Sequence, residues 1–250
     1  MNIILVIYQM KPLLVILGDS RLAKFNSFQD KFGPSDKYET LVWYQAGGKI
    51  SDLHKFIAEV KSKHCAAYPH RKALFIIAVG INNFTRRIYN DRNESELIAD
   101  RSVKPENIWA ELSSLKAETQ TVFETAVVII CSIPPVIYEK YNDFRGSKGK
   151  LTLPTISKLE SKNNTDYTLE QLKIVNREIS RANHEGQSGI RTKHISLHAN
   201  CLTSKKDKNQ NKYMQLIPGA LYDGLHPQRA TGLNWFHKIH KCAKFIVEQF

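Results

Sequence analysis

A small set of residue types in this 250-residue chain could together carry out nucleophilic chemistry. A Gly-Asp-Ser tripeptide at 18–20 follows an apolar run at 13–17, and Asp223 stands three residues before His226. A serine hydroxyl is a poor nucleophile until a base removes its proton, and an imidazole oriented by a carboxylate is such a base. The pattern predicts Ser20 as the nucleophile, His226 as the base and Asp223 as the group that orients the imidazole.

Attack on a carbonyl also requires hydrogen-bond donors for the negative charge that develops on its oxygen. The backbone N–H of Ser20, a glycine N–H from the Gly47-Gly48 pair and the side-chain amide of Asn82 are candidates. Each of these signals, taken alone, also fits an ordinary turn. The interpretation depends on their combination, because each one follows a different apolar run.

The apolar runs predict the elements that position these residues. They lack the alternation of half-exposed strands and are typical of strands buried on both faces of a parallel sheet; the runs are 13–17, 40–44, 73–79, 126–133 and 194–198. Amphipathic helical patterns follow or precede them at 51–64, 106–119, 168–184 and 230–248. This alternation predicts a three-layer α/β/α architecture, in which ligands bind at the carboxyl ends of the strands.

We expect a single domain over residues 12–250, with residues 1–11 forming an N-terminal extension or an extra strand. A capping box at Thr168 and Gln171 is expected to begin the helix at 168–184. Residues 139–167 are interpreted as an insertion or long loop, and 203–213 as an exposed basic loop.

The motifs resemble those of the SGNH hydrolases, also called GDSL esterases and lipases, over residues 12–250. The matching pieces are VILGDSRL, QAGGKISDL, VGINN and YDGLHP. The resemblance implies a flavodoxin-like sheet of five parallel strands and hydrolysis of esters without a metal or other cofactor. It implies a catalytic triad of Ser20, Asp223 and His226, and an oxyanion hole formed by Ser20, Gly47 and Asn82.

The sequence departs from the family pattern in its third block and leaves one choice open in its second. Asn83 stands where the family usually has an aspartate, and we expect this change to affect loop geometry rather than abolish activity. The family's usual spacing before Leu53 favours Gly47 over Gly48 for the oxyanion hole, but a shift of one residue would select Gly48. Within the family, LGDSRL, SDL and IPP look most like the esterase domains of first open reading frames in some non-LTR retrotransposons.

The composition bears on partners and location. The net charge of +12 favours polyanionic partners, so the basic loops could contact nucleic acid or an anionic membrane surface. Neither a signal peptide nor an apolar run long enough for a transmembrane helix is evident, and we expect an intracellular, cytoplasmic protein.

The four dispersed cysteines do not form a zinc ribbon or a dense disulfide framework. His194, His198 and Cys201 could be grouped as metal ligands, but alternation on one strand explains the two histidines better.

The prediction is a metal-independent serine esterase that hydrolyses acetyl or other short acyl esters through an acyl-enzyme on Ser20. Two alternatives remain at this point. One is an SGNH-like nucleic-acid-binding module with little or no catalysis. The other is an acyltransferase that uses the same triad, because the acyl-enzyme half of the reaction is shared. The physiological ester and the oligomeric state are left open.

Overall fold

The computed structural model describes residues 10–32, 35–66, 70–152, 154–187, 189–206, 210 and 212–250. Most of the expected N-terminal extension, residues 1–9, lies outside the described residues, and only Met10 and Lys11 of it are seen before the first strand.

A parallel sheet with the strand order β2-β1-β3-β6 forms the centre of the fold. Its strands are β1 (Leu13–Asp19), β2 (Glu39–Gln45), β3 (Ala73–Ala78) and β6 (Val127–Ile130). Leu13 of β1 pairs with Glu39 on one side and Ala73 on the other. This is the 2-1-3-4 order of flavodoxin-like sheets, whose direction of winding reverses between the first and third strands. The predicted fold class, a parallel sheet flanked by helices, is confirmed.

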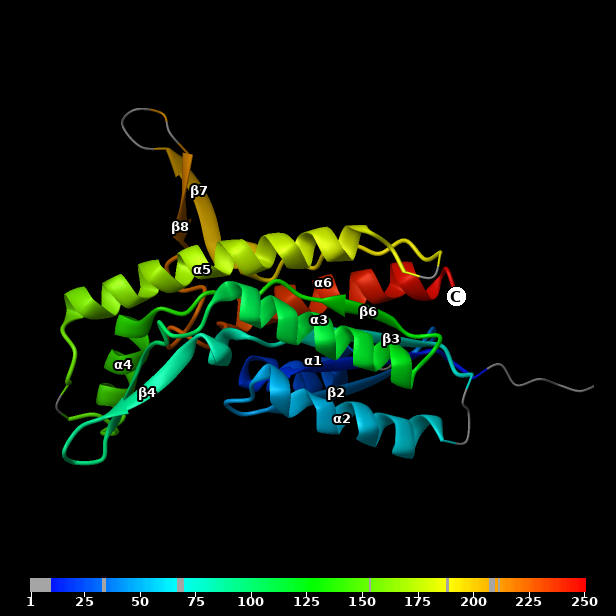
Figure 1. The fold of residues 1–250 in the computed structure, drawn as a ribbon, viewed down its shortest axis with the longest axis horizontal. Helices are drawn as coiled ribbons and strands as arrows, with labels where there is room; N and C mark the ends of the chain where they lie inside the picture. Colours follow the sequence, from blue (N-terminus) through cyan, green and yellow to red (C-terminus); the bar gives the residue numbers. More distant parts are fainter. Residues whose placement is uncertain are drawn as a thin grey trace, which may run out of the picture.

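Helices cover both faces of the sheet (Figure 1). Alternate residues of β1 enter separate apolar clusters, so both faces of the strand are buried, as its unbroken apolar run predicts. One face packs against α2 (His54–Val60), α3 (Pro105–Val122) and α5 (Lys158–His184). The other packs against α1 (Phe25–Phe32) and α6 (Arg229–Val247). Short helical turns occupy Ser20–Leu22, Ile50–Leu53, Lys61–Cys65, Ile81–Asn83 and His198–Asn200.

The fifth parallel strand, expected at 194–198, is not formed. Among the described residues the sheet has four strands, and this segment makes one backbone hydrogen bond next to β6, from Ser132 N to Ile195 O at 3.0 Å. Ile195 and Leu197 are nevertheless buried, which explains the apolar pattern that suggested a strand.

Side-chain amides occupy the outer edge of β6 in place of a fifth strand. Asn176, Asn183 and Gln187 each accept a hydrogen bond from a backbone N–H and donate one to the C=O of the same residue, at 2.6–3.3 Å. Their partners are Ile133, Ile130 and Val128, in that order. Because these backbone N–H and C=O groups are already hydrogen-bonded to side-chain amides, they are not free to pair with the backbone of a fifth strand.

The segment interpreted as a loop at 139–167 contains most of α4 (Tyr138–Ser147) and the first part of α5. Helix α5 begins at Lys158 and not at the predicted capping box. Ser157 is its N-cap, and the Ser157 side chain accepts a hydrogen bond from Glu160 N. Thr168 instead lies buried within α5, where its hydroxyl hydrogen-bonds that of Tyr138 at 3.0 Å.

Two antiparallel hairpins extend from the body of the fold. The first pairs β4 (Thr85–Tyr89) with β5 (Ser95–Ala99). The second pairs β7 (Leu202–Lys206) with β8 (Lys212–Leu216), replaces much of the expected basic loop, and projects away from the helices (Figure 1). Within the described part of the chain, no helix is both long enough and apolar enough to cross a membrane.

The amide pairs on β6 lead to a stability prediction. Asn183→Leu should lower the free energy of unfolding by about 2–4 kcal/mol, because it leaves the buried N–H and C=O of Ile130 without partners. Urea denaturation checks this, with Arg181→Ala on the exposed face of the same helix as the control. Equal stability of the two variants would show that the amide pairs do not hold this edge.

Candidate active site

Ser20 begins a helical turn directly after β1, and a buried ion pair fixes that turn. The carboxylate of Asp19 accepts hydrogen bonds from the backbone N, Nε and Nη2 of Arg21 at 3.0, 2.9 and 2.7 Å. The side chains of this pair are only 1% and 3% exposed. Arg21 also donates to Pro134 O at 3.4 Å, which connects the end of β1 to the loop after β6. The pair holds the backbone so that the Ser20 side chain faces the carboxyl edge of the sheet.

The glycine of the GDS tripeptide is required by the spacing of the strands. A Cβ atom at Gly18 would lie 2.3 Å from Ala78 O of β3 and 2.6 Å from Leu22 Cδ1. No larger residue fits there without moving backbone, so Gly18 lets β1 and β3 approach each other just below Ser20.

The loop before α6 places His226 opposite Ser20. Asp223 is buried, and its Oδ1 accepts from the backbone N–H groups of Leu225 and His226 at 2.9 and 2.7 Å. Its Oδ2 hydrogen-bonds His226 Nδ1 at 2.7 Å. Gly224 has φ +87°, and a Cβ atom there would lie 2.4 Å from Ile137 O, so the tight loop requires glycine.

Ser20, His226 and Asp223 form one continuous hydrogen-bonded chain. Ser20 Oγ lies 2.9 Å from His226 Nε2, and the other ring nitrogen faces the carboxylate of Asp223. Burial by itself would raise the pKa of Asp223, but the hydrogen bonds from the His226 side chain, the His226 backbone and the Leu225 backbone outweigh it and hold that pKa below its ordinary value. The carboxylate therefore stays ionised at neutral pH and favours the imidazole tautomer with a proton on Nδ1.

The remaining predicted residues, Gly47 and Asn82, line the same cavity of about 500 Å³ as Ser20 and His226. Gly48 N donates to Gln45 O at 3.0 Å and closes a turn in which Gly47 has φ +68°. The N–H of Gly48 is thus already used, while Gly47 borders the cavity. Asn82 Nδ2 donates to Gly48 O at 2.9 Å, and the amide carries a second N–H.

Asn83, at the position where the resemblance implies an aspartate, joins neighbouring loops. It is buried, its Oδ1 accepts from Ile50 N at 3.2 Å, and its Nδ2 donates to Glu111 Oε2 at 3.0 Å. Its contacts therefore hold the loop after β2 against the turn after β3.

The sequence interpretation did not identify Tyr222 as part of this site. Its ring stacks on that of His226, with centroids 5.8 Å apart and planes 24° apart. Tyr222 N also donates to His226 O at 2.9 Å. The residue covers one face of the imidazole, and its position next to Asp223 in the sequence was the available signal.

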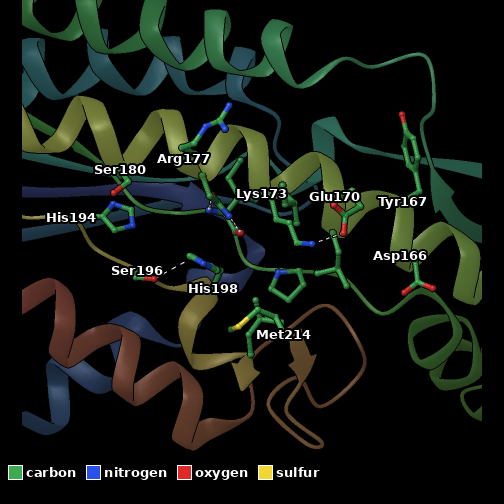
Figure 2. Close-up of a pocket in the computed structure, with 16 residues that line it drawn as sticks. Asp166, Tyr167, Glu170, Lys173, Arg177, Ser180, His194, Ser196, His198 and Met214 are labelled. Carbon is green, nitrogen blue, oxygen red and sulfur yellow. Dashed lines mark hydrogen bonds and ion pairs between the residues drawn. The ribbon is translucent and has the colours of Figure 1, made fainter. Parts of the chain in front are cut away.

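A second, larger cavity of about 850 Å³ lies between α5 and the β7–β8 hairpin (Figure 2). It contains none of the predicted site residues. His194 and His198 line it, and Figure 2 shows them on the segment that faces α5. Burial is the main reason that the pKa of each is lowered, that of His194 to about 4, so both are neutral at pH 7. Among the described residues, no cluster of three or more His, Cys, Asp or Glu side chains is arranged to hold a metal ion.

Comparison with known proteins identifies the fold. Neither a protein-family model nor a curated protein matches the sequence. A carbohydrate esterase family 3 protein from Talaromyces cellulolyticus superposes with a TM-score of 0.53 and 11% identity, covering 96% of this chain and 99% of that one. An acetyl esterase variant solved with an acetate ion superposes with a TM-score of 0.52 and 10% identity, covering 95% of this chain and 99% of that one. A protein from Parabacteroides merdae, described as a GDSL-like lipase, superposes with a TM-score of 0.51 and 11% identity, covering 95% of this chain and 97% of that one.

The buried ion pair below the serine leads to a second stability prediction. Arg21→Met should destabilise the protein by about 3–5 kcal/mol, because it leaves the Asp19 carboxylate buried without its charged partner. Adding Asp19→Asn to this variant should recover part of the loss, since the uncompensated charge is then gone. Urea denaturation of the single and double variants measures both effects, and a double variant less stable than Arg21→Met would contradict this role for the pair.

Proposed function

We propose that the protein is a metal-independent serine esterase that acts on carboxylic ester bonds. The observation that carries the proposal is the chain of two hydrogen bonds, 2.9 Å from Ser20 Oγ to His226 Nε2 and 2.7 Å from His226 Nδ1 to Asp223 Oδ2. The base lies within hydrogen-bond reach of both the nucleophile and the orienting carboxylate, and Ser20 and His226 open onto one cavity.

In the first half of the reaction, Ser20 Oγ attacks the ester carbonyl while His226 Nε2 takes the serine proton. The resulting imidazolium is stabilised by Asp223, which remains ionised. His226 then gives the proton to the oxygen of the leaving alcohol, and the acyl group stays on Ser20. In the second half, His226 removes a proton from water, the hydroxide attacks the acyl carbonyl, and the proton returns to Ser20 as the carboxylic acid leaves.

The oxyanion hole in this proposal consists of the backbone N–H groups of Ser20 and Gly47 and the second N–H of the Asn82 amide. Ser20 stands at the first position of a helical turn, where a backbone N–H has no partner within the turn. Gly47 is preferred to Gly48 because the N–H of Gly48 is already bonded to Gln45 O. We propose acetyl or other short acyl esters as substrates.

The names of the structural neighbours support a carboxylester hydrolase, since they include a carbohydrate esterase, an acetyl esterase and a GDSL-like lipase. The finer resemblance to retrotransposon esterase domains remains a proposal. The acyltransferase alternative differs only in the acceptor of the acyl group, and product analysis with added alcohols distinguishes it from hydrolysis.

A nucleic-acid-binding activity is the second candidate, and the β7–β8 hairpin favours it. Lys205 and Lys206 are exposed on β7, which projects from the body of the fold (Figure 1). The other two lysines of the expected basic loop do not contribute to this argument, because Lys208 and the side chain of Lys212 lie outside the described residues.

The first functional prediction concerns the nucleophile and the base. Ser20→Ala and His226→Ala should each remove nearly all hydrolysis of p-nitrophenyl acetate while leaving the unfolding transition intact. Asp223→Asn should also be severely impaired, because it favours the wrong imidazole tautomer. Steady-state kinetics of purified variants measure the effect, and wild-type turnover by Ser20→Ala would refute the proposal.

The second concerns the oxyanion hole. Asn82→Ala should lower kcat by about 10²–10³ with KM changed only a few-fold, because its donor acts mainly on the transition state. Asn107→Ala, on the exposed surface of α3, is the matched control and should behave like wild type. A large rise in KM with kcat unchanged would place Asn82 in substrate binding instead.

The third concerns nucleic acid. If the hairpin binds it, log affinity should fall linearly with log salt, and Lys205→Ala with Lys206→Ala should reduce the slope by about one to two. Fluorescence anisotropy with labelled single-stranded RNA measures both. Absence of binding at low salt would exclude this second candidate.

A further inference from the structure

The cavity at Ser20 is lined by several positively charged side chains. Three of its lining residues are cations, Lys49, Arg86 and Arg87, and none of the described residues that line it is an aspartate or glutamate. Lys49 comes from the loop after β2, whereas the two arginines come from β4. Cations therefore reach the same cavity from two separate segments of the chain.

These cations are not neutralised by the protein itself. Within the described part of the chain, none of the three side chains has a carboxylate at ion-pair distance. Among the described residues, the hydrogen-bond partners of the Arg87 side chain are uncharged oxygens, Ser95 Oγ at 3.2 Å and Tyr141 Oη at 3.3 Å. The cavity thus presents net positive charge beside the nucleophile.

The hairpin that carries the arginines is fixed to the body of the protein. Asn142 of α4 accepts from Leu97 N at 2.9 Å and donates to Leu97 O at 3.1 Å. Arg145 of the same helix donates to Ser95 O at 3.0 Å and to Ser95 Oγ at 3.1 Å. Because α4 clamps β5, and β5 pairs with β4, the backbone of Arg86 and Arg87 is held at the cavity.

We propose that this site selects esters that bear a negatively charged group, such as a carboxylate or phosphate, with Lys49, Arg86 and Arg87 as the residues that determine the specificity. The inference rests on the proposed esterase function and names its substrate class. The guanidinium group of arginine and the ammonium group of lysine bind such anions through charge-assisted hydrogen bonds. The planar guanidinium can donate two parallel hydrogen bonds to one carboxylate.

The physical consequence is mainly one of binding. A charge remote from the reacting carbonyl changes little during attack, so the cations stabilise bound substrate and transition state about equally. Anionic substrates should therefore have a lower KM with a similar kcat. The preference should also weaken as salt screens the exposed charges.

The test uses two pairs of esters, each with an anionic and a neutral member. In the first pair, 4-acetoxybenzoate and its methyl ester, the charge is on the leaving alcohol. In the second, mono-p-nitrophenyl glutarate and p-nitrophenyl butyrate, it is on the acyl group. The ratio of kcat/KM for the anionic to the neutral ester, corrected for spontaneous hydrolysis, should be about 10 in at least one pair at ~0.01 M salt and should be lower, but still above 1, at ~0.15 M.

Charge-changing variants connect this preference to the named residues. Arg86→Gln should lower the ratio by about 3-fold, and Lys49→Glu with Arg86→Glu by about 10-fold or more, through KM. Arg87→Lys, which keeps the charge, should retain most of the preference. Lys61→Ala, which removes an exposed charge beyond the end of α2, is the matched control and should leave the ratio unchanged. Urea denaturation verifies that each variant is folded.

The outcomes separate the two proposals. Hydrolysis that requires Ser20 and favours the anionic ester through these cations supports the inference, and the responding pair shows whether the charge belongs to the acyl or the alcohol part. Hydrolysis that requires Ser20 with no preference in either pair, or with a preference that the variants leave intact, overturns the inference and leaves the esterase function standing. If neither type of ester is hydrolysed in a manner that depends on Ser20, the esterase function itself fails.

Discussion

The carboxylate of Asp223 is the group on which the geometry of the site depends. One oxygen accepts two backbone N–H groups of its own loop, and the other holds the imidazole of His226. The same carboxylate therefore shapes the loop and aims the ring at Ser20. Since these hydrogen bonds lower its pKa, their contribution to stability is present above the ordinary carboxyl range and is lost as the pH falls through the lowered pKa.

The sheet supplies the other half of this geometry. Winding reverses between β1 and β3, and the residues after these two strands, Ser20 and Asn82, open onto the cavity at that point. The ion pair of Asp19 with Arg21 fixes the turn at Ser20, and Gly18 allows the two strands to approach closely. The GDS tripeptide thus combines one residue for strand packing, one for turn geometry and one proposed for chemistry.

The sequence predicted the parts of this arrangement that depend on local pattern. Unbroken apolar runs identified the four strands, and the turn after the first strand pointed to Ser20. The Asp-x-x-His spacing before the last helix pointed to Asp223 and His226. The prediction of a fifth strand was wrong, because the segment at 194–198 is buried without forming a ladder of backbone hydrogen bonds. A buried segment has the same apolar sequence pattern whether or not it pairs with a neighbouring strand. The amides at the edge of β6 are visible in the sequence as two polar residues, Asn176 and Asn183, within the apolar face of α5. The roles of α4 and of the β4–β5 hairpin depend on contacts distant in sequence, such as that of Asn142 with Leu97, which no local pattern contains.

Covalent labelling of the protein shows whether His226 activates Ser20 as a nucleophile. A fluorophosphonate reacts with a serine only where a base removes its proton and donors stabilise the developing oxyanion. Peptide mass spectrometry of the labelled, folded protein should locate about one phosphonate per chain on Ser20, with labelling lost in His226→Ala and in urea-unfolded protein. No labelling of the folded wild-type protein, or a label on another residue, would show that Ser20 is not an activated nucleophile.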